Sequence, residues 1–153
     1  METKDVLGTR VIAQVGLIVK DIEATSQAYA DFFGVEKPAW FWTDTYDKAQ
    51  TQYRGEPSEA RAKLAFFSMG PLQLELIEPD EKPSTWRAFL DEKGEGVHHL
   101  AFVIDGMKEK VSLMEGLGMP LVQKGEYTGG RYAYMETMKD LKVMLELLEN
   151  DKT

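Results

Sequence analysis

Two segments of the chain match each other, and each carries a carboxylate between leucines. Leu74-Glu75-Leu76 recurs as Leu145-Glu146-Leu147, and a second glutamate follows three places after each of these glutamates. Two short apolar runs also match, one opened by Gln14 and the other by His99. Self-similarity of this kind indicates two structurally similar modules. The residue types offer an imidazole, an amide and two carboxylates, which are groups that bind metal ions or move protons.

All four residues lie in segments with strand character, and this predicts where their side chains point. Successive side chains of a strand face opposite sides, so Glu75 and Glu146 point away from the leucines that flank them. A carboxylate in the middle of a strand with an apolar opposite face is costly unless it has a partner. Gly16 and Ala101 leave room beside the two strand-opening residues. If the modules pack about a pseudo-twofold axis, the four polar side chains meet.

One imidazole nitrogen and three oxygens suit a divalent ion that keeps positions open for water or substrate. The sequence therefore predicts one divalent metal ion (Zn, Ni, Co or Mn), with Gln14, Glu75, His99 and Glu146 as its ligands. The neighbouring His98 is predicted to point to the opposite face of its strand.

The elements that must position these residues follow the order strand, helix, strand, strand, strand, twice over. Helices are expected from the cap Asp21 to Gly34, at 84–93, and at 107–117 before Gly118. Residues 46–59 are expected to form a long loop or an extended hairpin, and loops of that length are often functional. Strands are expected at 14–19, 38–46, 61–69, 72–79, 99–104, 119–124, 131–136 and 142–149. The predicted fold class is α+β, with two tandem βαβββ modules forming a curved mixed sheet around one metal site.

Composition narrows the classes of function. The 153 residues carry a net charge of −8, which argues against nucleic acid as a partner. No apolar run approaches the roughly 20 residues that span a bilayer, and 1–10 does not have the pattern of a signal peptide. The absence of cysteine excludes disulfide and thiolate chemistry. We therefore expect a cytoplasmic protein with no membrane partner. The cations expected to be surface charges, or to form a local anion pocket, are Arg54, Arg61, Lys63 and Arg131.

The stretch 89–102, with Gly94-Glu-Gly-Val-His-His-Leu-Ala-Phe102, resembles the pattern of methylmalonyl-CoA epimerases. On these residues, and on Met69-Gly70 before the 74–79 strand, the chain from about 10 to 150 resembles the vicinal oxygen chelate superfamily. That superfamily includes glyoxalase I, methylmalonyl-CoA epimerase, extradiol dioxygenases and bleomycin-resistance proteins. The resemblance implies a single glyoxalase-like domain at 1–150, divided into module one at 9–80, a linker helix at 83–94 and module two at 96–150. It also implies a homodimer.

The leading hypothesis is a metal-dependent isomerase or lyase of the epimerase type, which acts on an acyl thioester through an enolate. Glu146 is expected to remove the proton from one face. Glu59 falls where the resemblance places a second catalytic carboxylate, when positions are counted back from Glu75. The epimerases usually carry histidine in the first strand, whereas this chain has Gln14, a residue familiar at that place from some glyoxalase I enzymes.

Two alternatives stay open. The first is a lactoylglutathione lyase of the glyoxalase I type, which acts on a thiol adduct and accommodates Gln14. The second is a non-catalytic protein that binds a small planar compound on an aromatic platform around Trp40 and Trp42, with Phe41 and Tyr46. Core packing is the competing interpretation of the two tryptophans. An iron(II) dioxygenase is disfavoured, because that chemistry uses two histidines and one carboxylate. Glu78 and Glu149 are expected to be solvated or salt-bridged at the surface.

Overall fold

The computed structural model describes residues 5–152, so the first four residues of the predicted domain lie outside the described part. Ten strands and five helices form in the described residues. The helices are α1 (Ile22–Phe33), α2 (Tyr46–Ala49), α3 (Thr85–Lys93), α4 (Met107–Gly116) and α5 (Met138–Leu141). The strands are β1 (Gln14–Ile18), β2 (Phe41–Trp42), β3 (Gln52–Tyr53), β4 (Glu56–Pro57), β5 (Ala62–Met69), β6 (Leu72–Pro79), β7 (Gly96–Val103), β8 (Leu121–Tyr127), β9 (Gly130–Met135) and β10 (Met144–Asn150).

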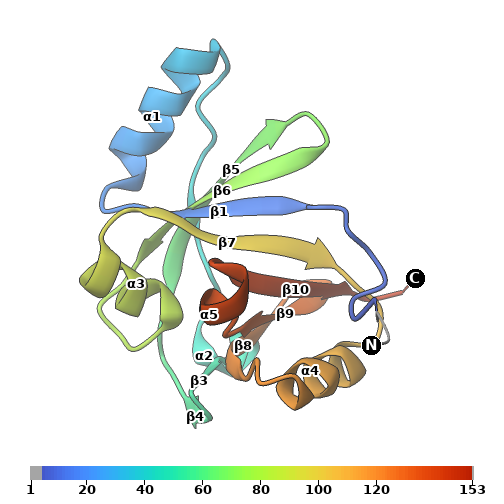
Figure 1. The fold of residues 1–153 in the computed structure, drawn as a ribbon. Coiled ribbons are helices and arrows are strands. Elements are labelled where there is room, and N and C mark those ends of the chain that lie inside the picture. Colours follow the sequence, from blue (N-terminus) through green and yellow to red (C-terminus); the bar gives the residue numbers. More distant parts are fainter. Residues whose placement is uncertain (1–4, 153) are drawn as a thin grey trace.

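All ten strands belong to one mixed, curled sheet with the order β2-β5-β6-β1-β7-β10-β9-β8-β3-β4 (Figure 1). Its centre is the antiparallel pair β1 and β7, the first strand of each module. Each of these strands has the last strand of its own module as a parallel neighbour, β6 beside β1 and β10 beside β7. The arrangement has the pseudo-twofold symmetry expected from the repeat and confirms the predicted α+β fold class.

Helices cover the outer face of the sheet, one in each half. Leu74 and Leu76 of β6 pack in a buried cluster with Ile22 and Ala30 of α1. The equivalent Leu145 and Leu147 of β10 pack in a second cluster with Met107 and Met114 of α4. This confirms that the leucines flanking each central glutamate face the helices, so the glutamates face the inner, concave side. A third cluster, which includes Ile77, Trp86 and Tyr134, lies on that inner side.

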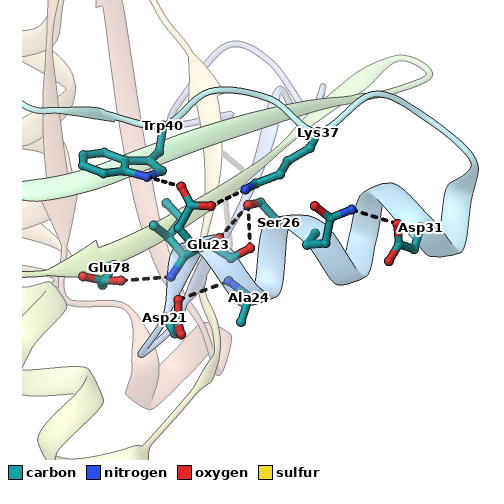
Figure 2. A network of polar contacts seen from close by, with 10 residues as sticks. Asp21, Glu23, Ala24, Ser26, Asp31, Lys37, Trp40 and Glu78 are labelled. Carbon is teal, nitrogen blue, oxygen red and sulfur yellow. Dashed lines mark hydrogen bonds and ion pairs between the residues drawn. The ribbon is translucent and has the colours of Figure 1, made fainter.

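The second glutamate of each repeat holds the start of the helix in its own module. Glu78 accepts a hydrogen bond from the backbone N–H of Ile22 at 2.9 Å (Figure 2). It also pairs with Lys63. Glu149 accepts from the backbone N–H groups of Gly106 and Met107 at 3.0 Å. Free N–H groups at a helix N-terminus favour a negative charge. Both glutamates are half-buried and form salt bridges, which is one of the two roles expected from the sequence. In addition, they fix α1 and α4 against the sheet.

The helix boundaries follow the predicted signals closely. Asp21 caps α1 by accepting from the backbone N–H of Ala24, and Gly34 ends it in the left-handed conformation. Ser84 caps α3 by accepting from the backbone N–H of Arg87. Around α1, Figure 2 also shows Glu23 bonded to Lys37 and to the indole N–H of Trp40. The half-buried Trp40 therefore packs between α1 and the sheet.

The segment between α1 and β5 differs from the prediction. The strand expected at 38–46 is reduced to the two residues of β2, which pairs with β5 at one edge of the sheet. Residues 46–59 contain α2 and the short hairpin of β3 and β4, and β3 pairs with β8 of the second module. One loop thus reaches from the outer strand of module one to the outer strand of module two. The turn α5 before β10 is a further element that the sequence patterns did not indicate.

The described helices are all too short, or too polar, to cross a membrane.

Candidate metal centre

The four predicted ligands meet on the inner face of four adjacent strands at the centre of the sheet. They are Gln14 of β1, Glu75 of β6, His99 of β7 and Glu146 of β10. All are buried: His99 is fully enclosed, and the other three retain 5–7% of their exposure. Three of them, Glu75, His99 and Glu146, offer ligand atoms that all lie within 4.8 Å of one another. The structure therefore brings together the residues that the repeat singled out.

The donor atoms surround one point at nearly equal spacings. His99 Nε2 lies 3.1 Å from Glu146 Oε1, 3.3 Å from Glu75 Oε1 and 3.2 Å from Gln14 Oε1. The amide oxygen of Gln14 lies 3.2 Å from the same oxygen of each glutamate. Ligands about 2.0–2.2 Å from a zinc or magnesium ion stand about 2.8–3.6 Å from one another in octahedral or tetrahedral geometry. The observed spacings fall within that interval.

The orientation of Gln14 also suits a cation. Its amide oxygen faces His99 and the two carboxylates, while its amide nitrogen donates to Gln73 Oε1 at 2.9 Å. An oxygen that faces two carboxylates is repelled by them unless a positive charge, from a metal ion or a protonated His99, lies between them. The reversed amide would direct a nitrogen with two hydrogens at the same three atoms, which is the orientation that suits the cluster without an ion. The residues therefore fit a divalent ion when the amide oxygen points inward, and Gln73 holds it in that orientation.

Gly16 makes room for the histidine, as the sequence predicted. A Cβ at Gly16 would lie 2.0 Å from Cε1 of His99 and 2.5 Å from each of its ring nitrogens. The backbones of Gly16 and His99 are paired across β1 and β7, and the imidazole packs directly against the backbone of β1. Any larger residue at this position would push the ring away from the other three donors.

The charges of the cluster depend on one another. Burial would by itself lower the pKa of His99, but the carboxylates of Glu146 and Glu75 raise it to about 9. Burial raises the pKa of Glu75, and the neighbouring His99 opposes that shift. Without an ion, the cluster is therefore held together by an imidazolium between carboxylates. A divalent ion can replace that positive charge at the same point.

The prediction for His98 was wrong, and a bulge in β7 is the reason. The pairing of β1 with β7 shifts between Gly16, which faces His99, and Leu17, which faces Val97, so His98 is an extra residue. A bulge interrupts the alternation of side chains. His98 is 1% exposed, and its Nδ1 lies 2.9 Å from Nδ1 of His99. The two histidines are thus in contact rather than on opposite faces.

A cavity of about 560 Å³ opens above the cluster. Gln14, Glu75 and Glu146 lie in its wall, while His99 is covered by them. Seven aromatic side chains also line the cavity, and the loop that crosses between the modules contributes Ala49 and Thr51. The aromatic residues are Phe41, Trp42, Phe66, Trp86, Tyr127, Tyr132 and Tyr134. Phe66 lies across from Glu75 on β5, so strand alternation alone could have placed it there.

Other predicted site residues are placed differently. Glu59 is exposed and does not line the cavity, so the structure does not bring it together with the four donors. Phe41 and Trp42 of the proposed aromatic platform line the cavity, whereas Trp40 packs against α1. The four candidate cations also lie outside the cavity wall: Arg61 and Lys63 stack on tryptophans, Arg54 stacks on Tyr53, and Arg131 pairs with carboxylates.

Comparisons with known proteins agree with this architecture. Residues 13–135 match the family model of the glyoxalase/bleomycin resistance protein/dioxygenase superfamily. The uncharacterised protein YqjC of Bacillus subtilis strain 168 is 31% identical over 94 residues, which cover 60% of this chain and 67% of that protein.

Two solved structures share the fold at low identity. Methylmalonyl-CoA epimerase from Mycobacterium tuberculosis superposes with a TM-score of 0.64 at 21% identity, over 99% of this chain and 94% of that one. A Streptomyces coelicolor methylmalonyl-CoA epimerase variant in complex with 2-nitronate-propionyl-CoA superposes with a TM-score of 0.61 at 22% identity, over 92% of this chain and 97% of that one. With the family model matching most of its length, the chain belongs to the glyoxalase/bleomycin resistance protein/dioxygenase superfamily.

Proposed function

We propose that this protein is a divalent-metal-dependent isomerase or lyase that acts on a carbonyl compound through an enolate. The observation that carries the proposal is the buried cluster at the floor of a cavity, in which one imidazole nitrogen lies 3.1–3.3 Å from each of three oxygens. When bound there, a divalent ion would chelate two substrate oxygens and stabilise the negative charge of the enolate.

The two carboxylates are the proposed proton carriers. Glu146 and Glu75 come from opposite modules, and both lie in the cavity wall. A substrate carbon above the cluster would then have a carboxylate on either side, one to accept the proton from carbon and one to return it. We assign this second role to Glu75, because Glu59 is exposed and does not line the cavity. The aromatic wall would exclude water from the enolate.

Epimerisation of a 2-substituted malonyl-type thioester is the leading specific reaction. It is supported by the likeness of the fold to two methylmalonyl-CoA epimerases and by the sequence pattern around His98 and His99. The cavity has room for a short acyl group, and its opening would leave the rest of a thioester outside. The proton would leave the carbon between the two carbonyl groups and return to its other face.

Charge favours a second candidate, isomerisation of a thiol adduct that is uncharged at its reacting end, as in glyoxalase I. Glu75 and Glu146 would already neutralise a divalent ion, and the cavity wall adds the carboxylates of Asp44 and Glu126. None of the residues lining the cavity, among those the structure describes, is a lysine, arginine or histidine. A malonyl-type substrate brings a carboxylate at its reacting end, which this wall would repel, whereas a hemithioacetal brings none at that end.

Deuterium exchange tests both reactions with one readout. The protein, loaded in turn with Zn, Ni, Co or Mn, would be incubated in D₂O with a 2-methylmalonyl thioester or with the hemithioacetal of methylglyoxal and glutathione. We expect metal-dependent deuterium incorporation next to the carbonyl of one substrate. Glu146→Gln should abolish it, Glu75→Gln should reduce it at least ~10-fold, and Glu59→Gln should leave it unchanged. Exchange with neither substrate in a metal-loaded protein would contradict the proposal and favour a non-catalytic binding protein.

A further inference from the structure

His98 is a fully buried, ionisable side chain that has no part in the site as described so far. It lies between the sheet and the first turn of α3, and its ring packs edge-on against Phe89 and Tyr134. Both of its nitrogens have polar neighbours: Nδ1 lies 2.9 Å from Nδ1 of His99, and Nε2 lies 3.2 Å from Oγ1 of Thr85. Among the described residues no buried side-chain nitrogen or oxygen lacks a partner, so this contact belongs to a fully connected network.

The contact between the two histidines restricts where their hydrogens can be. Two imidazole nitrogens 2.9 Å apart form a hydrogen bond only if one donates and the other accepts. His99 directs Nε2 towards Glu75, Glu146 and Gln14, and a nitrogen that binds a metal ion carries no hydrogen. Its hydrogen must then be on Nδ1, where the one polar neighbour is Nδ1 of His98. His98 therefore has to accept at Nδ1 and donate from Nε2.

The surroundings of His98 favour that arrangement. His98 is 1% exposed and its ring is enclosed by Phe89 and Tyr134, where a charged imidazole would be costly, so the neutral ring that can accept at Nδ1 is favoured. The polar neighbour of His98 Nε2 is the Thr85 hydroxyl at 3.2 Å, and a hydroxyl oxygen can accept a hydrogen as well as donate one. The first residue of α3 thus receives the hydrogen of His98 Nε2.

We propose that His98 is a positioning residue that selects the metal-binding tautomer of His99 and transmits the placement of α3 to the metal centre. The chain of contacts runs from Thr85 through His98 Nε2 and Nδ1 to His99 Nδ1. It leaves His99 Nε2 free to bind the metal ion. The β7 bulge is the structural device that makes this possible, because regular alternation would have put His98 on the other face. The inference rests on the proposed metal centre, and the test below separates the two.

Substitutions at position 98 distinguish the hydrogen bond from simple packing. His98→Asn places an amide oxygen near the position of Nδ1 and can still accept from His99. His98→Leu fills the space with similar volume but accepts nothing. Partners of a ligating histidine contribute roughly 10–100-fold to metal affinity when they are lost. We therefore expect cobalt affinity to fall by roughly 10–100-fold in His98→Leu and by less than about 3-fold in His98→Asn, with Thr85→Val in between.

Two spectroscopic readouts complete the test on the full chain. The cobalt-loaded protein reports its ligand geometry through the visible absorption bands, and ¹⁵N-resolved NMR of labelled histidine reports which ring nitrogen of His99 carries hydrogen. The inference predicts hydrogen on Nδ1 of His99 in the zinc-loaded protein, and the same for the ion-free protein. Equal cobalt affinities and spectra for wild type and a folded His98→Leu would overturn it. Zinc bound through Nδ1 would overturn it as well.

The ion-free spectrum keeps the two proposals separate. If wild-type protein binds no divalent ion, but the Nδ1 hydrogen of His99 is bonded to His98, the metal-dependent function fails and the hydrogen bond from His99 to His98 stands. If the ion binds through Nδ1 of His99, the metal centre stands and the role of His98 fails. Should His98→Leu not fold, the comparison of wild type with His98→Asn and Thr85→Val gives the same decision.

Discussion

At the scale of single residues, the proposed metal centre depends on close packing around His99. The imidazole fits only because Gly16 has no side chain, and Gln14, Glu75 and Glu146 each direct one oxygen towards its Nε2. Buried donors and acceptors of this kind are stable when each has a partner and costly when one is lost. Substitutions that move the ring should therefore affect metal binding more than they affect the fold.

Gly16→Ala is the most direct such change. The new Cβ would collide with the His99 ring, so we expect a loss of about 1–3 kcal/mol in the free energy of unfolding. Metal affinity should fall at least ~10-fold, because the ring must leave the other donors. Gly116→Ala is the matched control: it lies in α4 with open space around it and should raise stability by up to about 1 kcal/mol. Chemical denaturation and cobalt titration measure both. Normal metal affinity in Gly16→Ala would refute the packing argument.

The residue-level prediction from sequence succeeded where strand alternation holds. Glu75 and Glu146 could be placed on the inner face because both lie in regular strands with buried leucines on either side. His98 could not, since the bulge arises from pairing between two strands that are far apart in the chain, where Leu17 faces Val97 and Gly16 faces His99. The location of Glu59 depends on the path of a loop, and counting back from Glu75 says nothing about that path.

At the scale of elements, hydrogen bonds at helix starts connect the helices to the site. The capping residues Asp21 and Ser84 were recognisable in the sequence, because short polar side chains before an apolar helix supply acceptors for free N–H groups. The start of α4 was not, since its acceptor is Glu149, a residue from the last strand. A cap supplied by a neighbouring residue can be predicted from the sequence. A cap supplied by a residue far along the chain can be recognised only once the fold is known.

The two caps allow a matched test of how α3 supports the metal centre. Ser84→Ala and Asp21→Ala each remove one capping acceptor, and each should lower the free energy of unfolding by about 0.5–2 kcal/mol. Thr85, which follows Ser84, touches His98, whereas α1 makes no contact with the metal ligands through a polar group. Metal affinity should therefore fall in Ser84→Ala and stay unchanged in Asp21→Ala. Equal affinities in the two variants would contradict a link from α3 to the site.

Short strands limited the prediction of the sheet edges. β2, β3 and β4 have two residues each, which is too few for any period to be recognised in the sequence. Their positions follow from pairing with β5 and β8, on opposite sides of the sheet. The consequence for the site is large, because this crossing loop supplies Ala49 and Thr51 to the cavity wall.

At the scale of the whole molecule, the two modules enclose a polar cluster within an aromatic cavity. Burial raises the pKa of Tyr134 well above its usual value, and the charges of Glu146 and Glu75 raise it further. Burial is also the main reason why the pKa of Tyr132 is raised. Tyrosines in the unfolded chain ionise near their usual pKa of about 10. Below that pH both states are neutral, so the contribution of these tyrosines to stability is fully present.

Above about pH 10 the unfolded state loses protons that the folded state keeps, so stability should fall as pH rises. Each such tyrosine contributes a slope of up to about 1.4 kcal/mol per pH unit. Tyr134→Phe removes one of them, and its free energy of unfolding should decline less steeply than that of the wild type. Urea unfolding between about pH 8 and pH 11 measures both slopes. Parallel slopes would show that Tyr134 ionises normally in the folded protein.

The central claim is that four side chains from two modules form one divalent-metal site. Elemental analysis of the purified protein, combined with thermal melts in Zn, Ni, Co and Mn, tests it most directly. We expect nearly one ion per chain in the wild type and in Glu59→Gln, and none in His99→Ala or Glu146→Gln. An ion at about 100 times its dissociation constant adds about 2.7 kcal/mol, which should raise the wild-type melting temperature by roughly 5–10 °C. A wild-type protein that contains no metal and melts at the same temperature with every ion would contradict the account.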